Sequence, residues 1–524
     1  MRQAIKELLD NYSKNIRSRD DLEAIKRLLC KKYHLKSLLN SDILQEYRLL
    51  LTEQKISPQA SLEHILQKRA VRTMSGIAPV AVLTKFYPCP GNCAYCPHES
   101  DVPTSYLSNE PAVMRAIRCG YDPYKQVISR LKALENNGHE PTKIELIVIG
   151  GTWSYLPTKY KYWYILNCFK AANDFQKKII DFKNVYKKNL GLSDLKKLLA
   201  FEQKKNETAK HNLIGLTLET RPDYINEKEL REMRELGCTR VEIGVQAIDD
   251  QILLLNQRGH GVKEIAEATK LLKQFGFKVT YHLMPALPGA TPRKDLALFQ
   301  KLFTDERFQP DQIKFYPTVV TKGSLLYKWY KQGKYQPYSD KVLQELIVKC
   351  KAAVPTYVRI IRLIRDIPEE SIIAGNKITN LRQIMQARGV KCDCIRCREA
   401  KEQIITNYQI NIIAYAASGA KEYFISADSR DGKVLFGFCR LRIDETSQVA
   451  PAIIRELHVY GQLVPRGGQK KIQHTGLGKE LLLDAERLSR TAGVKKMAII
   501  SGVGARGYYK KLGYKLKETY MVKM

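Results

Sequence analysis

The chain has 524 residues, which is enough for two or three domains with hydrophobic cores of ordinary size. It carries 87 Lys and Arg against 54 Asp and Glu, a formal net charge of +33, and a chain this basic attracts polyanions such as nucleic acid or an anionic membrane surface. No apolar run reaches the roughly 18 to 20 residues of a membrane span, and the N-terminus lacks the apolar core of a signal peptide, so we expect a cytoplasmic protein.

Residues 1–75 are predicted to form a basic helical segment. Ile5, Leu8, Leu9 and Tyr12 follow the i, i+3, i+4, i+7 spacing of an amphipathic helix, and a second such stripe begins at Leu22. The segment holds 15 basic against nine acidic residues. Apolar stripes are usually core, whereas the basic faces opposite them suit RNA.

Residues 76–375 are predicted to form an α/β domain. Strand, helix, strand in this order indicates a parallel sheet. Six such units predict a partial (βα)6 barrel, in which ligands bind at the carboxyl ends of the strands. The predicted strands are residues 80–86, 144–149, 213–218, 241–245, 279–284 and 313–316, with helices such as 227–236 and 263–274 between them.

A lysine-rich stretch, residues 159–210, follows the second predicted strand. It holds 13 Lys against five acidic residues. Aromatic rings among lysines suit nucleic acid, because rings stack on bases while ammonium groups meet phosphates. The same rings could equally be the buried face of helices, and a lysine-rich proteome would explain the charge alone. The aromatic residues concerned are Tyr160, Tyr162, Trp163, Phe169 and Phe175.

Six of the twelve cysteines fall into two tight clusters, which in a cytoplasmic chain indicates metal rather than disulfides. Cys89, Cys93 and Cys96 stand in YPCPGNCAYCP, with CxxxCxxC spacing, just after the first predicted strand. Three thiolates can hold three irons of a 4Fe–4S cluster. The fourth iron is then open to chelate S-adenosylmethionine. A zinc knuckle or incidental thiols are the alternatives.

The second cluster, Cys392, Cys394 and Cys397 in KCDCIRCR, lies in a predicted linker, residues 376–404. Three thiolates within seven residues suit a structural zinc ion, which normally takes four ligands, and no fourth ligand is evident. Flanking Arg and Lys would lower the pKa values of the thiols. A cysteine patch without metal and a second iron–sulfur cluster are the alternatives.

Residues 405–524 are predicted to form an α+β domain with strands 434–443, 453–460 and 496–500 and a helix at 477–491. QHTGLG opens that helix and resembles the loop of the GNAT acetyltransferases that binds the pyrophosphate of CoA at a helix N-terminus. Tyr508 and Tyr509 are the candidates for holding or activating an acetyl-CoA thioester. The predicted acetyl-CoA contacts are Glu456, Leu457, His458, Val459, Gln473, His474, Thr475, Gly476, Leu477, Gly478, Tyr508 and Tyr509.

From Arg72 to Met524 the chain resembles the catalytic subunit of Elongator, the family of tRNA wobble-uridine acetyltransferases, in a stand-alone form. Eukaryotic members space the first two cysteines more widely than this chain does. The matching stretches are Glu110-Pro111, Met114–Arg118, Tyr121–Pro123, Gly150–Thr152, Glu219–Tyr224, Glu242–Gln246, Arg258–His260, Tyr316–Thr318, IIRELHVYG, QHTGLG and ISGVGARGYYKKLGY.

The resemblance implies roles for residues at the ends of the barrel strands. The glycines after the second strand would let the backbone approach the amino group of S-adenosylmethionine closely. Lys314 and Tyr316 would face the reacting acetyl group or the RNA base. The residues that the resemblance assigns to S-adenosylmethionine are Gly150, Gly151, Thr152, Glu219, Arg221, Gln246 and Lys314.

The implied reaction uses S-adenosylmethionine radical chemistry, with an electron donor protein, to add an acetyl-CoA-derived group to carbon 5 of uridine 34 in tRNA. A plain N-acetyltransferase needs no radical generator, so both halves in one chain favour this reaction. Their two pockets should then face each other across the zinc linker. A protein lysine acetyltransferase with a structural iron–sulfur cluster would leave Gly150, Glu219 and Lys314 unexplained, and a non-enzymatic RNA-binding scaffold is a third interpretation.

Overall fold

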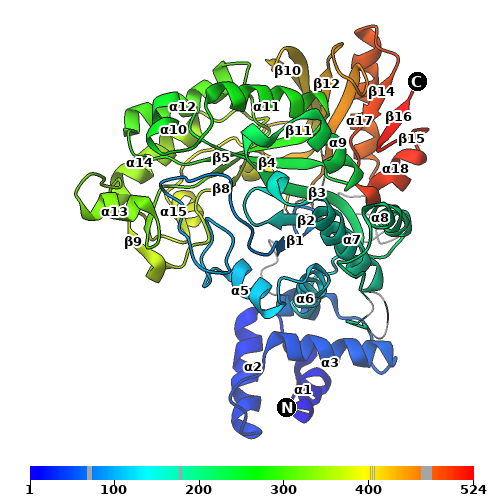
Figure 1. Cartoon of the computed structure of the whole chain (residues 1–524). Helices are drawn as coiled ribbons and strands as arrows, with labels where there is room; N and C mark the ends of the chain where they lie inside the picture. The colour runs from blue at the N-terminus through cyan, green and yellow to red at the C-terminus, as the bar shows by residue number, and fades with distance from the viewer. Residues whose placement is uncertain are drawn as a thin grey trace.

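The computed structural model describes residues 1–67, 73–175, 177, 180–183, 185–401, 403, 405, 407–461 and 475–524. Three parts follow one another in space as in the chain (Figure 1): an N-terminal helical lobe, a central sheet wrapped by helices and a C-terminal sheet. None of the described helices is long and apolar enough to cross a bilayer.

The N-terminal lobe is helical, as its apolar stripes predict. Ile5, Leu8, Leu22 and Leu29 are buried in a core separate from that of the barrel. The Arg48 guanidinium donates a hydrogen bond of 2.8 Å to the carbonyl of Glu135 and ties the lobe to the central domain. The helices are α1 (Arg2–Glu7), the π-helical turn Leu8–Tyr12, α2 (Arg19–Lys32), α3 (Asn40–Thr52) and α4 (Ala60–Leu66).

The central domain is an open, fully parallel sheet of seven strands in the order β1-β2-β3-β4-β5-β6-β8. The six predicted strands are confirmed. The seventh, β8, has the sequence RIIR and lacks the apolar run by which strands were sought. The strands are β1 (Ala78–Leu83), β2 (Lys143–Ile149), β3 (Asn212–Thr220), β4 (Arg240–Gln246), β5 (Lys278–Leu283), β6 (Gln312–Phe315) and β8 (Arg359–Arg362).

Helices cover the outer face of this sheet (Figure 1). Those after β1 are α5 (Pro111–Arg118) and α6 (Pro123–Asn136), and those after β2 are α7 (Thr158–Asp174) and α8 (Leu192–Asn206). The remaining helices of the domain are α9 (Glu227–Glu235), α10 (Asp250–Leu255), α11 (Val262–Gln274), α12 (Pro292–Thr304), α13 (Leu325–Lys331) and α14 (Asp340–Ala352).

The aromatic residues of the lysine-rich stretch are core residues. Tyr162, Trp163, Phe169 and Phe175 are buried, and Tyr160 is half-buried with its hydroxyl accepting from the Lys85 amide at 3.1 Å. The nucleic-acid stacking interpretation is therefore wrong for these rings, because they pack against other side chains in the hydrophobic core of the domain.

The C-terminal domain is a mixed sheet with α17 (Leu477–Thr491) packed against it. The predicted helix and three strands are confirmed, and four further strands were not predicted. The strand order is β10 (Tyr408–Ala417), β11 (Ala420–Ser429), β12 (Leu435–Ile443), β13 (Ala452–Val459), β14 (Met497–Ile499), β16 (Tyr520–Lys523) and β15 (Lys515–Lys517). The other elements are α15 (Leu381–Ala387), α16 (Ile395–Arg398), α18 (Arg506–Lys510), β7 (Val320–Thr321) and β9 (Ile372–Ala374).

A fully buried network of charges joins the barrel to the C-terminal sheet. Arg455 on β13 contacts Asp311, directly before β6, at 3.0 Å and Glu422 on β11 at 2.6 Å. The Lys273 ammonium on α11 lies 3.2 Å from Glu422. Burial alone would raise the pKa of Glu422, but Arg455, Lys273 and Arg442 lower it to about 2. Both carboxylates therefore stay ionised in the folded protein.

We expect Asp311→Ala to lower the free energy of unfolding by about 3–5 kcal/mol, because it removes one of the two carboxylates that hold the buried Arg455 guanidinium. Urea denaturation measures the change. The matched control is Asp305→Ala, which removes the partner of Arg307, a residue that is more than half exposed, and should cost less than about 1 kcal/mol. Equal costs for the two variants would contradict the role of the network.

Candidate functional site

The loop of Cys89, Cys93 and Cys96 follows β1 and is clamped at Ala94 by two segments. The Ala94 amide donates to the carbonyl of Asn256 at 3.0 Å, and its carbonyl accepts from the Leu326 amide at 2.7 Å. These bonds attach the loop to the ends of α10 and α13. The cysteines therefore lie at the carboxyl ends of the strands, where the sequence places them.

Two arginines face the central cysteine. Arg258 Nη1 lies 3.3 Å from Cys93 Sγ, and Arg221 Nη1 lies 4.0 Å from it. A hydrogen bond from Cys96, together with these two guanidinium charges, lowers the pKa of Cys93 to about 4 even though burial opposes ionisation. Cys93 is thus a thiolate at neutral pH, which is the form that binds iron.

The surroundings of the loop fit an iron–sulfur cluster with a polar ligand beside it. Gly91 has no room for a side chain, because a Cβ there would come within 2.1 Å of the Arg221 guanidinium. Gly150 adopts φ +133° beside Thr84 and brings the backbone after β2 close to the cavity. Gln246 Oε1 and Arg258 Nε are buried and have no hydrogen-bond partner among the described residues. These free polar atoms suit a polar cofactor.

Lys314 lies in a cage of two carboxylates and an imidazole. Its Nζ is hydrogen-bonded to Glu242 and lies 3.3 Å from Glu219 Oε1, and His282 Nε2 lies 2.9 Å from the same Glu242. The ring of Tyr316 packs edge-on against His282, with centroids 5.4 Å apart. Burial alone would lower the pKa of Lys314, but Glu242 raises it well above its ordinary value. Lys314 is therefore a permanent cation and not a base.

A single cavity of about 780 Å³ joins these groups to the C-terminal domain. Cys93 and Gly151 line one end, Lys314 lines the middle, and Glu456 and His458 of β13 line the other end. The lining also includes Thr152, Glu219, Arg221, Gln246 and Tyr316, together with Arg396 and Glu399 of the linker. Of the residues that the resemblance assigns to the barrel, Gly150 lies just outside this lining.

The predicted acetyl-CoA residues that the structure describes lie at the start of α17, on α18 and on β13. Gly476 adopts φ +98°, and a Cβ on Gly478 would lie 3.0 Å from the Tyr508 hydroxyl and 3.5 Å from Val459. Tyr508 is 40% exposed, whereas Tyr509 is 7% exposed and packs between Tyr508 and Tyr514. Tyr508 is accordingly the tyrosine that faces this loop. Thr475 and Leu477 belong to the same turn, and Gln473 and His474 lie outside the described residues.

The side chains of Glu456 and His458 do not point toward Tyr508. Glu456 pairs with Lys278 of the barrel at 2.9 Å and with Arg440 at 3.2 Å, and His458 Nε2 lies 2.8 Å from the carbonyl of Ser75. The prediction that Glu456 and His458 contact acetyl-CoA stays a prediction, and any such contact would lie on the cavity side of β13. Leu457 and Val459 alternate with these two residues along β13, so their side chains lie on the opposite face of the strand, which faces α17.

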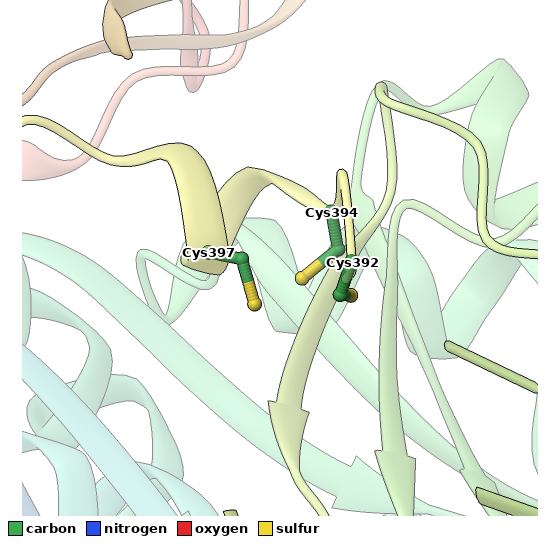
Figure 2. Close-up of side chains that lie close together, drawn as sticks. All are labelled: Cys392, Cys394 and Cys397. Carbon is green, nitrogen blue, oxygen red and sulfur yellow. The ribbon is translucent and has the colours of Figure 1, made fainter. Parts of the chain in front are cut away.

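Cys392, Cys394 and Cys397 bring their sulfur atoms within 4.8 Å of one another (Figure 2). Cys397 lies on α16 and the other two lie on the loop before it. Among the described residues no fourth metal ligand joins this group. The segment bridges the domains, because the Ile395 amide donates to the carbonyl of Val358 at 3.0 Å and Arg398 pairs with Asp428 at 2.6 Å.

Comparison with known proteins agrees with this geometry. Residues 85–302 match the Radical SAM superfamily, and residues 310–389 match the Radical_SAM C-terminal domain. The tRNA uridine(34) acetyltransferase of Dehalococcoides mccartyi is 44% identical over 87% of this chain and 99% of its own length. The human Elongator complex protein 3 is 39% identical over 88% of this chain and 86% of its own length.

The chain belongs to the tRNA uridine(34) acetyltransferase family of radical SAM enzymes. Its structure resembles that of the archaeal Methanocaldococcus infernus Elp3 with an N-terminal deletion, with a TM-score of 0.71 at 37% identity over 86% of this chain and 100% of that one. The expected family and fold class are therefore confirmed. The partial barrel and the C-terminal sheet correspond to this architecture.

Sequence reasoning missed three residues of this family member's site. Arg258 and Glu242 stand in matching stretches without an assigned role, and His282 lies in none of the matching stretches. Strand alternation could have identified Glu242 and His282. Glu242 lies two residues after the inward-facing Arg240 on β4, and His282 lies four residues after the inward-facing Lys278 on β5.

We expect Arg258→Gln to raise the pKa of Cys93 by about one unit or more from about 4 toward the ordinary thiol value near 8.5, because it removes a charge 3.3 Å from the sulfur. The pH dependence of Cys93 alkylation by iodoacetamide in cluster-free protein, followed by mass spectrometry, measures the shift. Arg362→Gln is the control, since Arg362 pairs with Asp366 instead. An unchanged midpoint for Arg258→Gln would show that Arg258 does not set the charge of Cys93.

Proposed function

We propose that this chain is a cytoplasmic enzyme that modifies uridine 34 of tRNA at carbon 5 with an acetyl-derived group. The observation that carries the proposal is the shared cavity, because cysteines suited to an iron–sulfur cluster and side chains of the C-terminal sheet line one space. The relatives' names supply the substrate class. A protein lysine acetyltransferase would need no such connection to a cysteine loop.

In this proposal Cys89, Cys93 and Cys96 hold a 4Fe–4S cluster, which an electron donor protein reduces. The cluster and S-adenosylmethionine, when bound, supply a radical that removes hydrogen from the acetyl methyl group. Gly150, Gly151, Thr152, Glu219, Arg221 and Gln246 would bind and orient S-adenosylmethionine.

Lys314 and Tyr316 would act on the substrates at the middle of the cavity. The permanent charge of Lys314 would attract a carbonyl oxygen, of either the thioester or the uracil, as negative charge develops on it. The methyl carbon radical would add to carbon 5 of the base. Return of one electron to the oxidised cluster and loss of the proton from carbon 5 would restore the uracil ring. Hydrolysis of the thioester, which releases CoA, would then leave a carboxymethyl group. Tyr508, with Tyr509 packed behind it, would hold the thioester beside Gly478 before the reaction.

We also propose that Cys392, Cys394 and Cys397 bind a structural zinc ion with a fourth ligand supplied from elsewhere. Their mutual approach suits one small ion. A hydrogen bond with Cys392 and the Arg382 guanidinium 3.9 Å away lower the pKa of Cys397, but Cys394 and burial outweigh them and raise it, contrary to the expectation from the flanking basic residues. Elemental analysis of the wild type against a Cys394→Ser variant tests this assignment, and equal zinc contents would remove it.

We expect the N-terminal lobe to carry part of the affinity for tRNA, because basic residues exceed acidic ones by six in residues 1–75. Phosphate contacts release counterions, so affinity should fall roughly 10³-fold or more between about 50 and 200 mM salt if six or more contacts form. Deletion of residues 1–67 should weaken binding and reduce this salt dependence. Fluorescence anisotropy with a labelled tRNA measures both, and an unchanged salt slope after the deletion would contradict the assignment.

The decisive test of the reaction uses acetyl-CoA with a deuterated methyl group, tRNA and S-adenosylmethionine under anaerobic reducing conditions. We expect deuterium in the 5′-deoxyadenosine and a carboxymethyl uridine in the digested tRNA, both measured by mass spectrometry. Lys314→Met should lower formation of the modified nucleoside at least 10-fold, because it removes one charge while keeping similar bulk.

Two controls sharpen this test. Tyr508→Phe should impair use of the thioester yet leave S-adenosylmethionine cleavage intact, and Cys93→Ala should abolish cleavage yet leave acetyl-CoA binding intact. If the label appears only as N-acetyl-lysine on protein, the protein acetyltransferase interpretation replaces this one.

A further inference from the structure

The inner side of the barrel is open along β1 and β2. In β1 the inward-facing Pro79 and Ala81 are partly exposed, while the residues between them are buried. Glu145 and Ile147 of β2 show the same alternation. A closed barrel of this kind fills its interior with layers of side chains. The half-exposed inner residues and the cavity that they line therefore mark an unfilled lumen.

The lumen runs the length of the strands. Cys93 and Gly151 line it at the carboxyl ends of the strands, and Glu456, His458 and Tyr460 line it at the opposite ends. Those three residues belong to β13 or directly follow it, so the C-terminal sheet closes the lower mouth of the barrel. The C-terminal domain thus meets the barrel at the end farthest from the cysteine loop.

Strand β13 separates this lower mouth from the predicted acetyl-CoA loop. Val459 faces Gly478 and Tyr508 on one side, while Glu456 and His458 face the lumen on the other. Among the described strands, β14 pairs with β13 only from Ala452 to Ile454, so the rest of β13 has no neighbour on that edge. A thioester held beside Tyr508 would therefore lie one strand away from the lumen, next to a gap in the sheet.

Three ion pairs line the lower lumen. Arg240 lies 3.0 Å from Glu145, Lys278 lies 2.9 Å from Glu456, and Arg359 lies 2.8 Å from Glu399. Arg396 of the linker lines the same cavity, and these groups offer hydrogen bonds to a chain with amide groups. The pantetheine arm of CoA has this chemistry. Lys278 and His282 lie four residues apart on β5, so about 13 Å separates the lower lumen at Lys278 from the Lys314 cage beside His282.

We infer that the acetyl end of acetyl-CoA enters the radical site through the barrel lumen, from the amino-terminal ends of the strands. The RNA base enters from the opposite, carboxyl end, and the two substrates meet at Lys314. This inference rests on the proposed function for the identity of the thioester. The arrangement keeps the reacting methyl group inside the protein, away from bulk water, until it meets the base.

A disulfide trap tests the path without any radical chemistry. Ala81→Cys places a thiol on the lumen wall, and its thiolate can attack the CoA sulfur of the mixed disulfide of CoA and methanethiol, forming a protein–CoA disulfide and releasing methanethiolate. We expect the adduct at position 81 of the anaerobic, cluster-loaded enzyme, located by peptide mass spectrometry. An excess of acetyl-CoA should reduce it at least 10-fold, and adding Gly478→Val, which fills the space beside Tyr508, should do the same.

Cystamine, a small disulfide, reports whether position 81 is accessible, and Ala387→Cys, at an exposed site on α15, reports unhindered reaction. Modification of position 81 by cystamine but not by the mixed disulfide of CoA and methanethiol would overturn the inference. So would no modification by either reagent. An adduct that persists with Gly478→Val would place the entry elsewhere and overturn it as well.

A plug in the lumen provides the second measurement. Ala81→Leu should lower the ratio of carboxymethyl uridine formed to 5′-deoxyadenosine formed at least 10-fold, whereas Ala387→Leu should leave the ratio unchanged. Thermal unfolding and the iron–sulfur absorbance check that the variant is folded and loaded. A wild-type ratio in folded Ala81→Leu would overturn the path. Absence of carboxymethyl uridine in the wild type would instead refute the proposed function, and the trap at position 81 would still decide the path.

Discussion

The arrangement of the molecule depends on the charges buried between the barrel and the C-terminal sheet. Arg455 reaches Asp311 and Glu422 at once, and Lys273 holds Glu422 from the other side. Taking these groups out of water is expensive, so they are tolerated only where each meets its partner. An apolar interface would allow one sheet to shift slightly over the other, because burial of apolar surface has no preferred direction. Charges with several fixed partners accept one relative position, and we infer that they set the register between the two domains.

A β-bulge lets one strand serve both the network and the cavity. The pairing of β12 with β13 shifts so that Arg455 is an extra residue between Ile454 and Glu456. Arg455 and Glu456 consequently both face the barrel, although they are neighbours in sequence. Beyond the bulge the ordinary alternation resumes, and Val459 turns toward Gly478. The strand that docks the domains thus also forms the wall between their two pockets.

The sequence was most informative where one local signal decides the structure. Apolar runs located the six strands, and cysteine spacing located both metal candidates. β8 was not predicted because two of its four residues are Arg359 and Arg362, which break the apolar run. The charge of Arg359 is stabilised by Glu399, 40 residues further along the chain. The rings of α7 were ambiguous for a similar reason, since an aromatic among lysines has the same pattern whether it meets RNA or a neighbouring helix. The bulge at Arg455 lets Arg455 and Glu456 both face the barrel, and no local signal in the sequence announces a bulge.

The cage around Lys314 shows how the chain handles charge beside an iron-binding loop. Glu219, Glu242 and His282 place their ligand atoms within 4.8 Å of one another, which is the spacing of a metal site. Lys314 contributes its ammonium group to this cluster, and its covalent attachment means that the cation cannot be lost or exchanged for iron. Glu242 in turn keeps its charge, because Lys314 and His282 outweigh the burial that would raise its pKa. The cage therefore supplies one fixed positive charge facing the cavity, while the thiolates of the cysteine loop remain the preferred ligands for iron.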